Sequence, residues 1–256
     1  MEFIFKMKIS VITATFNRAH IIRDCIESVL RQDYKNYEYI VVDGASKDNT
    51  VDMLKEYEPK FEGKMRWISE PDKGLYDAIN KGIRMATGEV VGIINSDDYF
   101  HRADSFEVIA KAFEESGVNA IYADERVVDD NDMTLYYDRG NYFRTWMYRI
   151  GLMPGHASFY AKKSLFEQYG YYKTDYKITA DYELMMRFAY INHVKMKYIP
   201  EDLLSFRTGG VSTQMSQKMR LHKEQVKACR ENGLFCIQPM IWIKYLFKIF
   251  LYTKNR

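Results

Sequence analysis

Polar side chains recur where apolar, β-branched segments end in the first hundred residues. Each of four such segments is followed by residues that bind ligands or transfer protons, namely Thr13, Asp43, the pair Glu70 and Asp72, and the run Asn95, Ser96, Asp97 and Asp98. One such residue is most simply a helix cap or a turn residue. Four in succession favour a site, because ligands of open α/β sheets bind beyond the carboxyl ends of the strands.

The run from Asn95 to Asp98 carries hard oxygen ligands of the kind that Mg²⁺ and Mn²⁺ prefer, and these ions share their coordination shell with substrate phosphates. The alternative is a turn whose acidic residues cap the next helix. The chain has no G-x-G-x-x-G and no G-x-x-x-x-G-K-[ST] motif, so dinucleotide-dependent dehydrogenases and P-loop NTPases lose their main support.

The elements that would position these residues alternate along the chain. Short β-branched runs predict strands and 3.6-residue periodicity predicts helices. The expected strands are 8–13, 37–43, 65–69 and 89–95, and the expected helices between them are 18–32, 48–57 and 75–86. Helices at 104–116 and 181–192 and strands at 118–123, 133–138 and 195–199 would complete the same domain. This pattern predicts an α/β fold with a mostly parallel central sheet covered by helices on both faces.

Composition and charge narrow the class of protein. The chain has 256 residues, of which 47% are apolar, enough for one domain with an appendage. Cys25, Cys229 and Cys236 are odd in number and far apart, which excludes a disulfide framework and indicates a reducing compartment. We expect no secretory signal, because the first residues lack its pattern, and no transmembrane helix, because no run of about 18 apolar residues occurs.

The charge is divided unevenly along the chain. Residues 216–256 contain nine Lys or Arg and two Asp or Glu, whereas residues 1–215 contain 28 and 33. An acidic body at 1–215 followed by a basic tail at 216–256 is therefore the expected organisation. Nucleic-acid binding is not expected, since the basic residues gather beside an apolar segment and the body is acidic.

Several segments occur in an order that together resembles the family 2 glycosyltransferases. They are 16–19 (FNRA), 42–50 (VDGASKDNT), 70–82 (EPDKGLYDAINKG), 93–98 (IINSDD), 155–160 (GHASFY), 179–184 (TADYEL) and 206–212 (FRTGGVS). The resemblance covers roughly residues 7–213. It implies the Rossmann-like GT-A fold and transfer of a sugar, with inversion, from a nucleoside diphosphate sugar, most simply a UDP-sugar, in bacterial cell-surface polysaccharide synthesis.

The resemblance also assigns the donor site. It implies that Asp43 accepts a hydrogen bond from the base and that Asp97 coordinates a Mn²⁺ or Mg²⁺ ion on the diphosphate. The other residues that it places at the nucleotide are Thr13, Thr15, Asn17, Arg18, Asp72, Lys73, Asn95, Ser96 and Arg207. Position 95 departs from the family's D-x-D pattern, since an amide stands where the family has a carboxylate. An amide still hydrogen-bonds a ribose, but it contributes no charge to a metal.

The general base implied by the resemblance is Asp181, which begins a predicted helix whose dipole would keep a carboxylate ionised. N-capping is the structural alternative for this residue. His156, Glu183 and Asp98 are expected as auxiliary or acceptor-binding residues, and Arg207 would reach phosphate from a loop with a Gly209-Gly210 hinge. A structural histidine and a surface ion pair are the alternatives for His156 and Arg207.

Two features bear on the acceptor. Processive relatives carry Q-x-x-R-W, whereas residues 217–221 read QKMRL, which favours the addition of a single sugar. Residues 239–252 are apolar except for Lys244 and Lys248, and they predict an interfacial helix with Trp242 and Tyr245 at headgroup depth. The alternative is a helix docked on the body or on a second subunit, as in a homodimer. A saccharide or a polyprenyl-diphosphate-linked acceptor, at the cytoplasmic face of the cytoplasmic membrane, is expected.

Two other functions remain open at this point. A sugar nucleotidyltransferase would share the sheet, but its loop after the first strand is usually glycine-rich, and residues 14–19 (ATFNRA) contain no glycine. A non-catalytic subunit that binds nucleotide sugars is the other, and Asn95 is its support.

Overall fold

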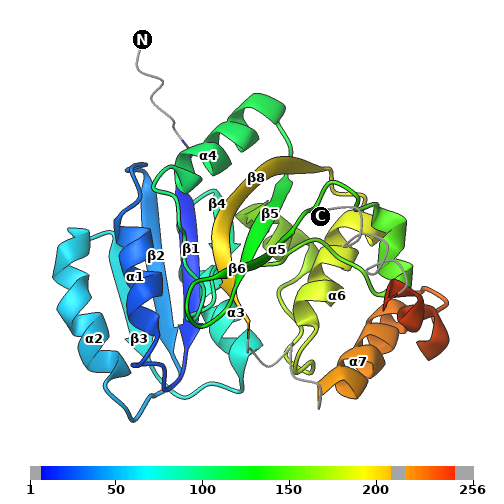
Figure 1. Cartoon of the computed structure of the whole chain (residues 1–256), viewed down its shortest axis with the longest axis horizontal. Coiled ribbons are helices and arrows are strands. Elements are labelled where there is room, and N and C mark those ends of the chain that lie inside the picture. The colour runs from blue at the N-terminus through cyan, green and yellow to red at the C-terminus, as the bar shows by residue number, and fades with distance from the viewer. Residues whose placement is uncertain (1–6, 209–216, 246–256) are drawn as a thin grey trace.

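The computed structural model describes residues 7–208 and 217–245, which form one mixed eight-stranded sheet with helices packed against both faces (Figure 1). The sheet order is β3-β2-β1-β4-β7-β5-β6, with β8 also paired to β5. The strands are β1 (Ile9–Thr15), β2 (Tyr37–Asp43), β3 (Met65–Ser69), β4 (Val90–Ile93), β5 (Ala120–Val128), β6 (Thr134–Asp138), β7 (Tyr160–Lys162) and β8 (Met196–Arg207). The predicted α/β class with a mostly parallel sheet is confirmed.

The parallel half of the sheet brings the polar strand ends together. β1 pairs in parallel with β2 and β4, and β2 pairs in parallel with β3. The register sets Thr15 beside Asp43 and Asp43 beside Ser69. Every residue of β1 and β2 is buried, because apolar helices cover both faces of this part of the sheet. The polar residues that follow these strands therefore meet at one edge.

The helices divide between two apolar layers. α1 (Ile22–Leu30), α2 (Thr50–Tyr57), the short η1 (Glu58–Phe61) and α4 (Ser105–Ser116) pack on one face of the sheet. α3 (Leu75–Met85), η2 (Thr145–Ile150), α5 (Lys163–Tyr169) and α6 (Ala180–Met186) pack on the other face. On α3, Gly82 allows the close approach to β1, since a Cβ there would lie 2.4 Å from Ile12 Cγ2.

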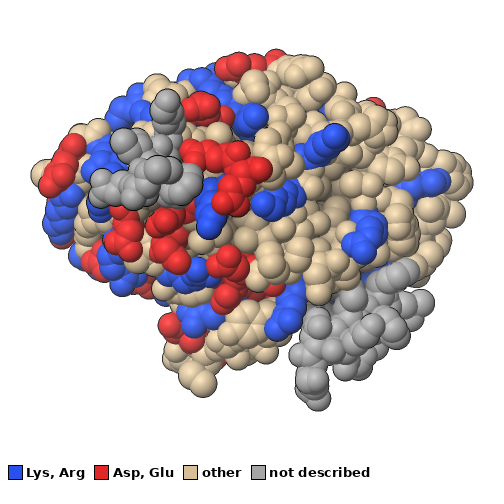
Figure 2. Space-filling model, turned by 90° about the horizontal axis from the view of Figure 1, so that it is seen from above, with Lys and Arg blue, Asp and Glu red and all other residues tan. Residues whose placement is uncertain are grey.

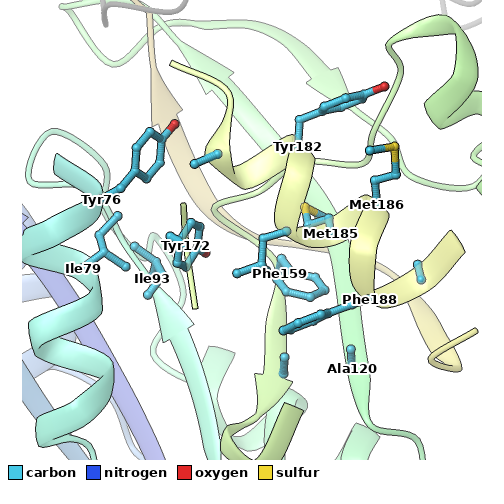
Figure 3. Packing of buried hydrophobic residues seen from close by; sticks show 14 of the residues in the cluster. Tyr76, Ile79, Ile93, Ala120, Phe159, Tyr172, Tyr182, Met185, Met186 and Phe188 are labelled. Atoms are coloured by element: carbon cyan, nitrogen blue, oxygen red, sulfur yellow. The ribbon is translucent and has the colours of Figure 1, made fainter. Parts of the chain in front are cut away.

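The second layer joins α3 to α6. Figure 3 shows Tyr76 and Ile79 of α3 beside Ile93 and Tyr172, with Met185 and the other α6 side chains on the far side of Tyr172 from α3. The predicted helix 181–192 is two pieces, because α6 ends at Met186 and residues 187–191 form a π-turn, η3 (Arg187–Ile191). This layer places the N-terminus of α6 opposite the end of β4.

Two strands run further than their sequences indicate. β5 extends to Val128 and β8 to Arg207, although charged residues and Pro200 interrupt both patterns. The two strands pair in parallel with register shifts around Asp124, and these irregularities accommodate the polar residues. As a consequence, the end of β8 reaches the loop that follows β4.

The tail packs on the body over the part that is described. α7 (Lys218–Glu231) lies against α6, and Ala228, Cys229 and Ile241 belong to the same apolar layer as α6. Residues 238–245 are helical, and Lys248 with the rest of the predicted 239–252 helix lies outside the described residues. In an interfacial helix the cationic Lys244 would face the lipid headgroups, but it is only 6% exposed and its Nζ donates to Gln225 Oε1 at 2.8 Å.

Candidate active site

A cleft of about 400 Å³ opens at the carboxyl edge of the parallel strands. Segments that are far apart in the sequence line it: the end of β1 and its loop, the start of α3, the loop after β4, the segment before α6, and the end of β8. The sequence-predicted residues among its lining are Thr15, Arg18, Asp72, Asn95, Ser96, Asp97, His156, Asp181 and Arg207. The fold therefore gathers one carboxylate from the β4 loop and one from α6 in a single cavity.

The wall formed by the β1 loop contains an unpaired hydroxyl. Thr15 is 5% exposed and lines the cleft, and its Oγ1 atom has no hydrogen-bond partner within the described ranges. A buried hydroxyl without a partner is costly, so a ligand that bonds it recovers that cost. Gly44 leaves room for the Asp72 carboxylate to lie against its backbone, because a Cβ at Gly44 would lie 2.5 Å from Asp72 Oδ2.

Four of the residues predicted to contact the nucleotide do not line the cleft, namely Thr13, Asn17, Asp43 and Lys73. The hydroxyl of Thr13 donates to the carbonyl oxygen of Ile94 at 3.0 Å and is fully buried inside the sheet. Asp43 is also fully buried, and its Oδ2 accepts hydrogen bonds from the backbone N–H of Ser46 at 3.0 Å and from the hydroxyl of Ser69 at 2.6 Å. Neither residue is among those that line the cleft, and the base contact of Asp43 stays a prediction.

Asn17 and Lys73 also lie outside the cleft lining. Asn17 has a φ of 53° and its Oδ1 accepts from the backbone N–H of Lys47 at 2.8 Å, so it joins the β1 and β2 loops. Asparagine tolerates this left-handed conformation better than most residues. The backbone N–H of Lys73 donates to Asp77 at 3.0 Å, and its side chain is exposed.

The loop after β4 separates the roles of two adjacent carboxylates. Asp98 is buried, and it accepts hydrogen bonds from the backbone N–H of Arg207 at 3.0 Å and from Asn95 Nδ2 at 2.8 Å. Burial, and then the charge of Asp97, raise the pKa of Asp98 well above its ordinary value. Asp98 therefore anchors the end of β8, and Asp97 is the carboxylate of this loop that faces the cleft.

Arg207 is held over this loop by three contacts. Its guanidinium lies 4.7 Å from the centre of the Tyr99 ring, donates to the carbonyl oxygen of Asp97 at 3.3 Å, and pairs with Asp24. A cation therefore stands beside Asp97 at the mouth of the cleft, where a phosphate would be attracted. The Gly209-Gly210 hinge predicted to follow it lies outside the described residues.

Asp181 faces His156 across the cleft lining. The Asp181 side chain is 14% exposed, and its Oδ2 lies 3.6 Å from His156 Nδ1. Asn95 Nδ2 lies 3.4 Å from His156 Nε2, so an amide and a carboxylate flank the two ring nitrogens of His156. Burial raises the pKa of Asp181, and His156 opposes that rise. The position of Asp181 at a helix start predicted that the helix dipole would keep it ionised. Burial is the larger effect, so its pKa is raised.

The sequence of the whole region matches one family model. The model described as "Glycosyl transferase family 2" covers residues 10–194, which is more than half of the chain. The chain belongs to the family 2 glycosyltransferases. The predicted family is confirmed, and the matched residues contain every part of the cleft except the end of β8.

Individual glycosyltransferases are similar over most of the chain. A PGL/p-HBAD biosynthesis glycosyltransferase of Mycobacterium tuberculosis is 26% identical over 211 residues, which cover 82% of this chain and 80% of that protein. An uncharacterised glycosyltransferase of the same species is 35% identical over 188 residues, 72% of this chain and 69% of that protein.

Solved structures show the same fold. TarS 1–349 of Staphylococcus aureus in complex with UDP-GlcNAc has a TM-score of 0.68 and 20% identity, over 87% of this chain and 66% of that one. Mannosyltransferase PcManGT of Pyrobaculum calidifontis, in complex with GDP-Man and Mn²⁺, also has a TM-score of 0.68, with 21% identity over 87% and 63%. The chain spans 39% of another TarS chain. The predicted GT-A fold of this glycosyltransferase is thereby confirmed.

Glu183 has a structural position in the glycosyltransferase and does not line the cleft. It is fully buried on α6 and pairs with Arg187 at 3.0 Å and with Lys173 at 3.1 Å, and Asn232 Nδ2 donates to it at 3.1 Å. A buried carboxylate with three partners has little capacity left for an acceptor sugar. The predicted auxiliary role of Glu183 is therefore not supported by its contacts.

The sequence reasoning missed part of the cleft wall. Tyr76 and Tyr172 stack with ring centres 5.8 Å apart, and Lys177 and Ile178 line the wall next to Asp181. The motif around 70–82 includes Tyr76, so a signal for that residue existed. Tyr172, Lys177 and Ile178 carry no pattern of their own, because only the packing of α6 against α3 brings them to the cleft.

Proposed function

We propose that this glycosyltransferase moves one sugar from a nucleoside diphosphate sugar, most simply a UDP-sugar, to a hydroxyl of a saccharide or lipid-linked saccharide, with inversion. The observation that carries the proposal is the shared cleft of Asp97 and Asp181. A single displacement needs stabilisation of the leaving diphosphate and a base for the attacking hydroxyl in one cavity. The UDP-GlcNAc and GDP-Man found in the TarS and PcManGT structures support a nucleotide-sugar donor.

The residues of the β4 loop fit a divalent metal ion that is shared with substrate. Among the described residues no group of three or more His, Cys, Asp or Glu could hold a metal alone. Asp97 supplies one carboxylate, and Asn95 uses its Nδ2 for Asp98, which leaves its Oδ1 as a second oxygen ligand. Mg²⁺ and Mn²⁺ accept such a sparse protein set when diphosphate oxygens complete it. A bound ion would neutralise charge on the leaving diphosphate.

The chemical step assigned to the chain is proton removal by Asp181. The acceptor oxygen attacks the anomeric carbon while the bond from that carbon to the diphosphate oxygen breaks, and the diphosphate leaves with both electrons. The acceptor proton passes to Asp181, whose raised pKa brings it closer to the operating pH of a base. His156 Nδ1, 3.6 Å from Asp181 Oδ2, orients the carboxylate.

Thr15 provides a test of the donor site that leaves the catalytic groups unchanged. In a Thr15→Val variant the dissociation constant of the nucleotide sugar should rise about 2- to 10-fold, the value of one hydrogen bond. The ligand-free protein should keep its melting temperature, since the lost hydroxyl has no partner within the described part of the chain. Calorimetric titration measures the constant, and an unchanged value would remove Thr15 from the donor site.

We also propose that the enzyme works at the cytoplasmic surface of the membrane, with the tail facing lipid. Phe235 is 70% exposed and Trp242 53% exposed, and Ile237 and Ile243 are exposed beside them in sequence. On the face shown in Figure 2, Asp and Glu lie among Lys and Arg on the side of α1 and α2, whereas the opposite side is mostly uncharged, with a few scattered Lys and Arg. Exposed apolar side chains that follow the basic helix α7 in the sequence suit an anionic bilayer surface. No helix in the described ranges is long and apolar enough to span a bilayer.

A vesicle experiment tests the membrane proposal. Replacing Phe235 and Ile243 together by Ser should weaken sedimentation with phosphatidylglycerol-containing vesicles about 10- to 100-fold, because two buried apolar side chains are worth a few kcal/mol. Met133→Ser, directly before β6 at a residue that is 64% exposed, is the control and should bind like the wild type. Equal binding of all three proteins would place the membrane contact elsewhere.

A thermal-shift screen tests the donor proposal. The screen compares UDP-glucose, UDP-N-acetylglucosamine and GDP-mannose, each with and without Mn²⁺. The cognate donor should raise the melting temperature by mass action, and more so with Mn²⁺. Donor binding without transfer to any acceptor and without slow donor hydrolysis would instead favour a non-catalytic subunit.

A further inference from the structure

One carboxylate of the tail fastens the segment that precedes α6. Glu224 Oε1 accepts a hydrogen bond from the backbone N–H of Lys177 at 3.1 Å. Its Oε2 accepts from the backbone N–H groups of Ile178 at 3.0 Å and Thr179 at 3.1 Å, and from the hydroxyl of Thr179 at 3.2 Å. Hydrogen bonds to an ionised acceptor are roughly twice as strong as neutral ones. Three consecutive residues are thus held by a single side chain from α7.

The tail helix holds the same segment at other points. The hydroxyl of Tyr176 donates to Glu231 at 2.8 Å, and the hydroxyl of Tyr182 lies 3.4 Å from Cys229 Sγ. These contacts flank Asp181 on both sides in the sequence. α7 therefore contacts the segment that carries the proposed base at several points along its length.

α7 is itself fixed to the body from its other side. Gln225 Nε2 donates to the carbonyl oxygen of Gly151 at 3.1 Å, and Cys229 Sγ lies 3.9 Å from the carbonyl oxygen of Tyr148 on η2, so both contacts are to residues outside α6 and the segment before it. α7 can position residues 177–179 only if it is anchored independently of them, and these contacts meet that condition. Glu224 is thereby held in place without help from the segment that it binds.

The segment that Glu224 holds is a wall of the cleft. Lys177 and Ile178 line the cavity, and Asp181 follows Thr179 by two residues. Among the described contacts, no side chain of the body takes the backbone N–H groups of 177–179, and Thr179 makes no capping bond to α6. Errors in the placement of this segment would carry directly to the Asp181 carboxylate.

We propose that Glu224 is a positioning residue for Asp181, so that the tail helix is part of the catalytic unit as well as of the membrane-facing surface. The inference rests on the proposed function, because it assigns Asp181 the role of base. It adds that loss of Glu224 impairs the chemical step and leaves donor binding intact.

The charge of Glu224 gives this role a signature in the pH profile. Glu224 raises the pKa of Asp181, after the larger effects of burial, of His156 and of two backbone hydrogen bonds. The groups that face Asp181 from the surrounding elements, or share its wall of the cleft, are His156, Glu224, Lys177, Tyr76, Tyr148 and Tyr172. The three tyrosines stay neutral, because burial raises their pKa values further. Removing the Glu224 charge therefore lowers the pKa of Asp181 and moves the acid limb of the rate profile to lower pH.

The experiment compares Glu224→Gln and Glu224→Ala with Glu231→Gln in the full chain. The Glu231 variant is the comparison, since it removes the same charge from the same helix and breaks the contact to Tyr176, but leaves the hydrogen bonds to 177–179 in place. Hydrogen exchange is measured at the amides of 177–179. Turnover of UDP-N-acetylglucosamine or GDP-mannose, whichever the donor screen selects, is measured with water or a saccharide as acceptor.

We expect exchange at 177–179 to accelerate about tenfold or more in Glu224→Ala, less in Glu224→Gln and not in Glu231→Gln. We expect kcat to fall about 100-fold and about tenfold in the two Glu224 variants, with the donor KM unchanged within about twofold. The acid limb should move to lower pH in Glu224→Gln. Wild-type exchange at 177–179, or a loss of kcat no larger than in Glu231→Gln, would overturn the inference.

The exchange measurement does not depend on turnover, so it separates two kinds of failure. If the wild type turns over no nucleotide sugar, the proposed function fails, and exchange still shows whether Glu224 orders the segment. If Glu224→Ala does not fold, Glu224→Gln retains one acceptor oxygen and decides the outcome alone.

Discussion

Replacing Asp181 by Asn lowers the rate of sugar transfer about 10³-fold, while the dissociation constant of the nucleotide sugar changes by less than about threefold. The amide has the size of the carboxylate but cannot take the proton of the acceptor hydroxyl, and general-base assistance is worth about 10² to 10⁴ in rate. Single-turnover measurements with saturating donor give the rate of the chemical step. Asp52→Asn on α2, where the side chain is 74% exposed, is the control for loss of one carboxylate.

The pH dependence of the wild type follows from the same assignment. The base must be ionised, so the rate falls as the pH drops through the pKa of Asp181. Burial raises that pKa, with His156 opposing, so the acid limb should lie above the ordinary range of an aspartate, about 3.9. Asp181→Asn should lose this limb. Normal turnover by the variant, with the limb intact, would remove Asp181 from the mechanism.

Replacing Asp97 by Asn should lower kcat/KM about 10²- to 10³-fold and remove the effect of Mn²⁺ on donor affinity. Asp97 is the carboxylate of the β4 loop that faces the cleft, since Asp98 is buried under the backbone of Arg207. Without its charge the loop offers only neutral oxygens to a divalent ion, and several kcal/mol of stabilisation of the leaving diphosphate are lost. Calorimetric titration of the donor with and without Mn²⁺ measures the effect.

The control for Asp97 is the Mn²⁺ dependence itself. In the wild type Mn²⁺ should tighten donor binding, whereas in Asp97→Asn the two titrations should give equal constants. A variant that still gains affinity from Mn²⁺ would show that the ion is bound without Asp97. The donor site would then need a different metal ligand.

The sequence predicts where the site lies better than it predicts which side chains enter it. Parallel strands place their carboxyl ends at one edge, so the gathering of the β1, β2 and β4 ends followed from the alternation of elements. The sequence pattern could not show that β1 continues past Thr13 to Thr15. Thr13 is consequently buried inside the sheet, whereas Thr15 lines the cleft and its hydroxyl has no partner among the described residues.

Contacts between distant segments account for the other differences. Asp43 stands at a strand end as predicted, but Ser46 and Ser69 occupy its oxygens. In the sequence, Glu183 resembles an active-site carboxylate of the TADYEL segment. In the structure it forms an ion pair with Arg187, one helical turn later. The pattern of a single sequence reports periodicity and local chemistry, whereas these pairings depend on side-chain direction.

The tail shows the same limit. Its basic and apolar composition predicted an amphipathic helix, and residues 218–231 and 238–245 are helical. Composition could not show that Lys244 is buried against Gln225 while Trp242 is exposed. Nor could it show that Glu224, one of two acidic residues in a basic stretch, binds the backbone before α6.

The most direct measurement is a crystal structure of Asp181→Asn with the nucleotide sugar selected by the donor screen and Mn²⁺. We expect the diphosphate to lie against Asp97, and the sugar to span the cavity so that its anomeric carbon faces residue 181. A donor bound outside this cavity, or one whose anomeric carbon points away from residue 181 with the diphosphate between them, would contradict the roles assigned to Asp97 and Asp181.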